Sequence, residues 1–204
     1  MTVPASHLVL HALAVRKHGG ADDIAVICDL DDATVSEQLK AAVDSGRAVE
    51  QGGRYALTPA AHMALRGAYA RHYAALRADD AFLEASAQFE RVNTELKALI
   101  TRWQTMTVAG QTVPNDHSDP DYDEAVIDDL GALHERAETV LRSLAANVPR
   151  LDRYRERLDA ALQQAEDGAH EWVSDARRDS YHTVWFELHE DLLRLLGRER
   201  EETV

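Results

Sequence analysis

Amide, hydroxyl and guanidinium side chains near the N-terminus are the first candidates for chemistry. Gln38 and Lys40 lie on a predicted helix, and Arg47 and Arg54 lie on the two arms of a predicted hairpin. Amide and cationic groups on a helix can hydrogen-bond to base edges, whereas guanidinium groups bind phosphates. The DNA-contact set that we expect is Thr34, Ser36, Gln38, Lys40, Arg47 and Arg54.

Acidic residues beside this set oppose DNA binding. Asp31, Asp32 and Glu37 would face phosphate groups, and neutralising phosphate supplies most of the affinity of proteins for DNA. The alternative is that the same module is structural or binds another protein.

A second group of side chains could line a pocket for an anion or another small ligand. It consists of Arg102, Trp103, His117, His182 and His189. His182 and His189 are seven residues apart, so they share one face of a helix. Aromatic stripes on helices are more often core, and the alternative is that these histidines bond to acids such as Glu187.

The remaining polar motifs are incomplete. Residues 119–130 begin like a calcium loop but have Glu124 at the sixth position and Leu130 at the twelfth. His7 and His11 have a spacing that two metal ligands could use, but no third ligand lies near, so we expect exposed imidazoles. The zinc, dinucleotide, phosphate-loop and nucleophile-elbow motifs do not occur in the sequence. We expect no metal, no cofactor and no enzymatic activity.

The secondary-structure elements that carry the DNA-contact set can be predicted from the spacing of apolar residues and from the capping, Gly and Pro residues at their ends. Helices are predicted at residues 6–18, 21–28 and 33–44, with Asp32 as the cap of the third. Residues 47–51 and 54–58 flank Gly52-Gly53, which can form the tight turn of a hairpin. Thr58-Pro59 then begins another helix. This is the order of a winged helix-turn-helix domain.

Residues 31–61, DDATVSEQLKAAVDSGRAVEQGGRYALTPAA, resemble the helix-turn-helix and wing of bacterial winged-helix regulators. The resemblance covers about the first third of the chain. It implies a winged-helix fold and, less specifically, a DNA-binding role in transcription regulation.

The rest of the chain is predicted to be helical. Helices are expected at residues 59–77, 80–104, 121–147, 149–168 and 175–196, with a loop at 107–120. Their apolar stripes suit an antiparallel bundle. We therefore expect a mainly α protein with a winged helix-turn-helix domain at residues 1–75 and an acidic helical bundle at 76–204.

Net charge differs between these two parts. Residues 1–72 hold seven Lys or Arg and eight Asp or Glu, whereas residues 73–204 hold fifteen and twenty-eight. The bundle should repel polyanions at long range.

A second resemblance involves ITRWQ at 100–104, NDHSDPDYD at 115–123 and DSYHTVWFELHEDLL at 179–193. These stretches resemble parts of actinobacterial helical proteins associated with phosphoenolpyruvate- and pyruvate-utilising dikinase-type enzymes. The resemblance implies an accessory or regulatory role beside such an enzyme rather than catalysis by this chain.

Together these features favour a cytoplasmic, non-enzymatic regulator. The longest apolar stretch, residues 7–15, is too short to cross a bilayer, and the single Cys28 excludes a disulfide framework. The leading hypothesis is a homodimeric DNA-binding regulator whose bundle dimerises or senses a ligand. The alternatives are a protein-binding module for a phosphoenolpyruvate- or pyruvate-utilising enzyme and a small-molecule-binding bundle.

Overall fold

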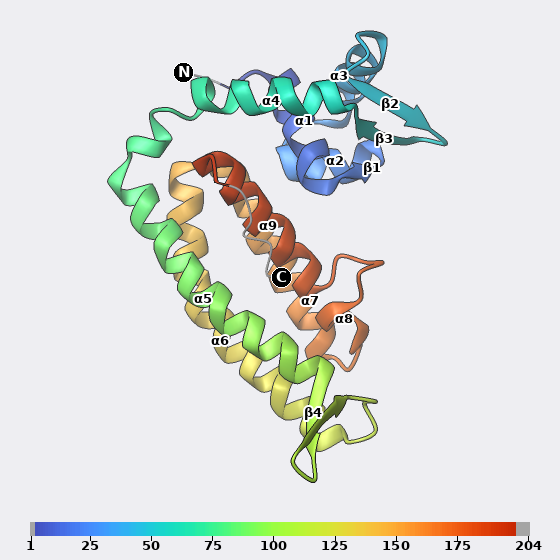
Figure 1. The fold of residues 1–204 in the computed structure, drawn as a ribbon, viewed down its shortest axis with the longest axis vertical. Helices are drawn as coiled ribbons and strands as arrows, with labels where there is room; N and C mark the ends of the chain where they lie inside the picture. Colours follow the sequence, from blue (N-terminus) through green and yellow to red (C-terminus); the bar gives the residue numbers. More distant parts are fainter. Residues whose placement is uncertain (1–2, 199–204) are drawn as a thin grey trace. The chain divides into compact units, whose positions relative to one another are not determined.

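The computed structural model describes residues 3–198, and it is mainly helical with two small antiparallel sheets (Figure 1). The chain divides into two compact units. The first contains the described residues up to Asp79 together with those from Glu187 onward, and the second is Asp80–Phe186. We had expected a single boundary near residue 75, with everything beyond it in the bundle. The division instead groups the last part of the C-terminal helix with the N-terminal elements.

The first unit contains the first four helices of the chain, and two of them, the third and the fourth, begin at a side-chain cap. The four helices are α1 (Ala5–Arg16), α2 (Ala21–Cys28), α3 (Asp32–Asp44) and α4 (Pro59–His72). Thr58 caps α4 by accepting a hydrogen bond from the Ala61 amide, and Pro59 occupies the first turn. The cap of α3 is Asp31, not Asp32 as we had predicted, because the Asp31 carboxylate accepts the Thr34 amide.

The predicted glycine-tipped hairpin is present in the first unit. Strands β2 (Ala48–Gln51) and β3 (Arg54–Leu57) pair antiparallel, and Gly52 and Gly53 both have positive φ in the turn between them. A third strand, β1 (His18–Gly19), pairs with β3 and gives the order β1-β3-β2. Strand β1 was not predicted, because two residues show no periodicity. Helix α1 ends at Arg16 rather than at His18, because His18 belongs to β1.

Helix α1 lies at the centre of the first unit. Its residues 11–15 are all buried, and it contacts α2, α3, α4 and β3. A helix that is apolar around most of its circumference must be covered on most sides. The later part of α9 (Tyr181–Leu196) also belongs here, and the Arg77 guanidinium donates to the Leu195 carbonyl at 2.7 Å. Arg77 lies within the short 3-10 helix η1 (Leu76–Ala78).

The second unit is a helical bundle. Its main helices are α5 (Asp80–Gln104), α6 (Pro120–Asn147) and α7 (Asp152–Glu166), followed by the short α8 (Glu171–Ser174) and the first part of α9. The 3-10 helix η2 (Pro149–Leu151) precedes α7. Helices α5 and α6 lie side by side along their length (Figure 1).

The loop predicted at residues 107–120 was partly wrong. Strands β4 (Thr105–Val108) and β5 (Gln111–Pro114) form a second hairpin between α5 and α6. Ala109 and Gly110 both have positive φ in its turn. The alternating Thr and Val residues were a strand signal, but Ala-Gly is a weaker turn signal than Asn-Gly or Asp-Gly.

The final helix begins at Tyr181 rather than at Asp175. Residues 176–179 form turns, and the Ser180 hydroxyl accepts the Thr183 amide at the start of α9. The Asp175 carboxylate accepts hydrogen bonds from the Arg177 guanidinium, which lowers the pKa of Asp175 to about 2. This local pairing competes with helix formation, as Asp side chains often do.

Aromatic side chains stack in the core of the second unit. The Trp185 ring stacks on Phe89 with 4.8 Å between the ring centroids, and its indole N–H donates to the Asn93 side-chain oxygen at 3.1 Å. The Tyr181 ring also stacks on Trp185, with 6.1 Å between the ring centroids. The core packing of this aromatic stripe is confirmed.

Within the described residues, none of the helices combines the length and the apolar character needed to span a membrane.

Truncating Trp185 to alanine should lower the free energy of unfolding by about 3–5 kcal/mol, because it removes a large side chain that is only 3 % exposed. The measurement is a urea titration followed by circular dichroism. The matched control is Trp172→Ala, at a half-buried ring beside Arg178, and it should cost much less. If Trp185→Ala leaves the urea midpoint of unfolding unchanged, the core assignment is contradicted.

Candidate functional site

The start of α3 is fixed by a charged cap. The Asp31 carboxylate accepts the Thr34 amide at 2.9 Å and the Thr34 hydroxyl at 2.8 Å. These hydrogen bonds lower the pKa of Asp31, so this group stays ionised at the helix start. The Thr34 hydroxyl, which we had placed in the DNA-contact set, donates to this carboxylate.

The solvent-facing side of α3 is mixed in charge. Ser36 and Lys40 are exposed and four residues apart, so they share one face, while Gln38 is half-buried. Exposed carboxylates also lie on this helix, at Asp32 and Glu37. The helix therefore offers one cation and few hydrogen-bonding groups to a partner.

The two arginines of the DNA-contact set have different surroundings. Arg54 is exposed on β3, and its guanidinium donates to the His18 carbonyl at 3.5 Å, which is a long contact. Arg47 lies between α3 and β2, where its amide donates to the Ala42 carbonyl at 2.8 Å. The Arg47 side chain reaches a cavity between α1 and α4.

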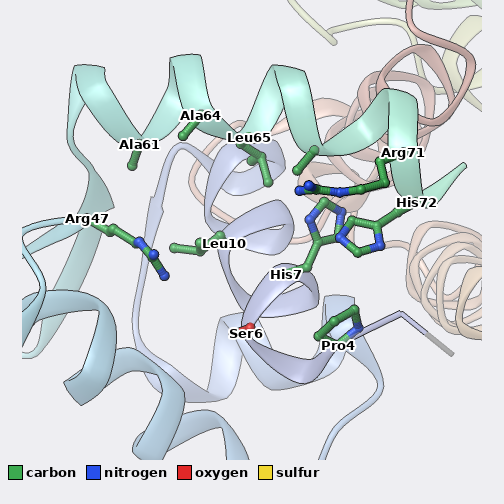
Figure 2. Close-up of a pocket in the computed structure, with 11 residues that line it drawn as sticks. Pro4, Ser6, His7, Leu10, Arg47, Ala61, Ala64, Leu65, Arg71 and His72 are labelled. Carbon is green, nitrogen blue, oxygen red and sulfur yellow. The ribbon is translucent and has the colours of Figure 1, made fainter.

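This cavity has a volume of about 250 Å³ and belongs entirely to the first unit (Figure 2). Its walls combine basic and apolar side chains and contain no carboxylate: Pro4, Ser6, His7, Leu10, Arg47, Ala61, Ala64, Leu65, Ala68, Arg71 and His72. The His7 and His72 ring centroids are 4.5 Å apart. Sequence reasoning missed this site because its residues come from helices that are fifty residues apart and match no motif.

The prediction of exposed imidazoles at His7 and His11 was wrong. Both are buried because α1 is covered by its neighbours. The His11 ring bonds to the Tyr69 hydroxyl through Nδ1 and to the Asp191 carboxylate through Nε2, each at 2.9 Å. Burial raises the pKa of Tyr69, so its hydroxyl keeps its proton. His7 packs edge-on against the Tyr69 ring.

Two residues of the predicted ligand pocket meet in the second unit. The rings of Trp103 and His117 have centroids 4.6 Å apart. The buried Asp123 carboxylate accepts from Asn115 at 2.8 Å and bonds to His117 Nδ1 at 2.9 Å. His170, which sequence reasoning missed, lies edge-on to Trp103 and 3.9 Å from the same carboxylate.

The other members of that predicted pocket have different partners or positions. The Arg102 guanidinium pairs with the exposed Asp129 at 2.8 Å. His182 is half-buried in the first turn of α9, and His189 is buried in the part of α9 that belongs to the first unit.

The pair of His117 and Asp123 orients an imidazole and anchors the loop before α6. Across the described part of the chain, no serine, threonine or cysteine side chain bonds to this imidazole. The same residues, 3–198, contain no group of three His, Cys, Asp or Glu arranged to hold a metal ion.

Another buried histidine, His134, lies on α6. Its Nδ1 is 3.2 Å from the Tyr181 hydroxyl. Burial lowers the pKa of His134 and raises that of Tyr181. A neutral imidazole whose Nδ1 accepts a hydrogen bond from the Tyr181 hydroxyl satisfies both groups.

No family model, curated protein or solved structure matches this chain.

Removing the Asp191 carboxylate should destabilise the first unit strongly. Asp191→Ala leaves the buried His11 ring without that partner, and the expected loss is about 3–5 kcal/mol in unfolding free energy. Urea unfolding measures it. Asp44→Ala, at an exposed position in α3, is the control and should stay within about 0.5 kcal/mol of wild type. A loss no larger than that of the control would show that the pair contributes little.

The lowered pKa of His134 predicts a pH effect. The unfolded chain takes up a proton as the pH falls through about 6.5, before the folded chain does, so acidification favours unfolding. His134→Gln should reduce the loss of unfolding free energy between pH 7.5 and 5.5. His18→Gln, at an exposed position, should leave that loss unchanged. An undiminished loss in His134→Gln would contradict the assignment.

Proposed function

We propose that the first unit is a winged helix-turn-helix module and that the protein is a cytoplasmic, non-enzymatic transcription regulator. The order of its elements carries this proposal. Three helices with a short strand after the first precede a glycine-tipped hairpin, the sheet order is β1-β3-β2, and α4 leaves the module. Winged-helix domains that bind DNA have this arrangement.

In this proposal α3 enters the major groove and the β2–β3 hairpin lies along the phosphate backbone. Lys40 and Ser36 are exposed on the same face of α3, whereas Gln38, two residues from each, is half-buried on the opposite side of the helix. Their donor and acceptor groups suit base edges. Arg54, exposed on β3, supplies a phosphate contact, and Arg47 supplies another from the α3–β2 junction.

The ionised Asp31 and the carboxylates on α3 limit the affinity for DNA. One lysine and two arginines neutralise few phosphates, so binding is expected to be weak and to require low salt or two copies of the module. A dimer held together by the helical bundle would present two modules to a palindromic site.

A second candidate is supported by the same carboxylates. Exposed Asp32, Glu37 and Asp44 on α3 suit a basic protein surface better than DNA. In this alternative the module is an accessory one that binds a protein, such as the phosphoenolpyruvate- or pyruvate-utilising enzyme that the second resemblance implies.

DNA binding can be measured by fluorescence anisotropy with the full chain and a duplex from its own upstream region, at about 50 and 200 mM salt. We expect a complex at micromolar protein in low salt. The double variant Lys40→Ala with Arg54→Ala should weaken it at least about tenfold and reduce the salt slope by about two, because two phosphate or base contacts are lost.

The matched control removes two exposed cations from the second unit, Arg91→Ala with Lys97→Ala. This variant has the same change in net charge and should bind as wild type does. No complex at low salt, or equal losses in both double variants, would overturn the DNA proposal and favour a protein partner.

A further inference from the structure

The cavity between α1 and α4 concentrates positive charge in a strongly acidic protein. Arg47 extends into it from one end, and Arg71 lies at the other end beside His7 and His72 (Figure 2). Neither guanidinium forms an ion pair with a residue in the range 3–198. The chain as a whole has a formal charge of −14, so a cavity lined by two arginines and no carboxylate is a local exception.

The middle of the cavity is apolar. Leu10 from α1 and Leu65 from α4 lie between the two basic ends, and Ala61, Ala64 and Ala68 leave room along α4. A cavity of ~150 Å³ lined by apolar side chains holds a benzene ring. The volume of about 250 Å³ therefore fits one ring with a small polar group.

We propose that this cavity binds a small organic anion, a carboxylate on a compact aromatic or cyclic body. Arg71, with its planar pair of donors, binds the carboxylate beside His72. The ring packs on Leu10 and Leu65, and Arg47 closes the opposite end. Basic side chains select against a cation, and the lack of acids leaves both arginines available.

The position of Arg47 connects this site to DNA, and this step rests on the proposed function. Arg47 belongs both to the cavity wall and to the DNA-contact set. One guanidinium cannot serve a ligand in the cavity and a phosphate outside it at the same time. An occupied cavity therefore weakens DNA binding, and DNA weakens ligand binding by the same factor.

The test is calorimetric titration of the full chain with benzoate, without DNA. Benzamide has the same ring without the charge, and acetate has the charge without the ring. We expect benzoate to bind with one site per chain, and both comparison compounds to bind at least about tenfold more weakly.

Two variants locate the binding. Arg71→Gln removes the charge, and Ala64→Leu fills the space from an exposed position on α4. Each should weaken benzoate binding at least about tenfold, whereas Arg91→Gln in the second unit should not. Circular dichroism checks that the variants are folded. Equal binding of benzoate and benzamide, no binding at millimolar benzoate, or variants that bind like wild type would each overturn the site.

The DNA titration repeated with saturating benzoate tests the coupling separately. Benzoate should lower the DNA affinity of the wild-type chain but not that of Arg71→Gln. A wild-type DNA affinity that benzoate leaves unchanged overturns the coupling. Failure of DNA binding alone overturns the proposed function but leaves the calorimetric result standing. Failure of benzoate binding alone overturns the cavity proposal but leaves the DNA result standing.

Discussion

Burial of the His11 imidazole between a hydroxyl and a carboxylate is the interaction on which the first unit depends. The ring lies at the centre of α1 and bonds to Tyr69 of α4 and to Asp191 of α9. These bonds pair polar groups whose burial in an apolar core would otherwise lower the free energy of unfolding. They also set the spacing of α1 and α4, the two helices that form most of the cavity wall.

Much of the first unit could be predicted from local signals. The Gly52-Gly53 turn and the Thr58-Pro59 helix start each act within a few residues, and both were recognised. The burial of His11 could not be predicted, because its partner Asp191 is 180 residues away and no local pattern records such a contact. The cavity could not be predicted for the same reason, because it depends on how far apart α1 and α4 lie in the folded chain.

In the second unit, periodicity identified the helices but not the features between them. Helices α5 and α6 followed their apolar stripes closely, whereas the β4–β5 hairpin has a turn with a weak sequence signal. Of the residues expected to line a ligand pocket, Trp103 and His117 are in contact, whereas Arg102 pairs with Asp129. Residue types suggested the cluster, but they could not identify Asp123 as the carboxylate that holds it.

We propose that α3 and the β2–β3 hairpin form the surface that binds DNA. Amide hydrogen exchange of the full chain, with and without the upstream duplex at low salt, tests it most directly. We expect slower exchange on DNA addition at residues 31–57, with the second unit unaffected. Protection confined to the second unit, or none at residues 31–57 while DNA is bound, would contradict it.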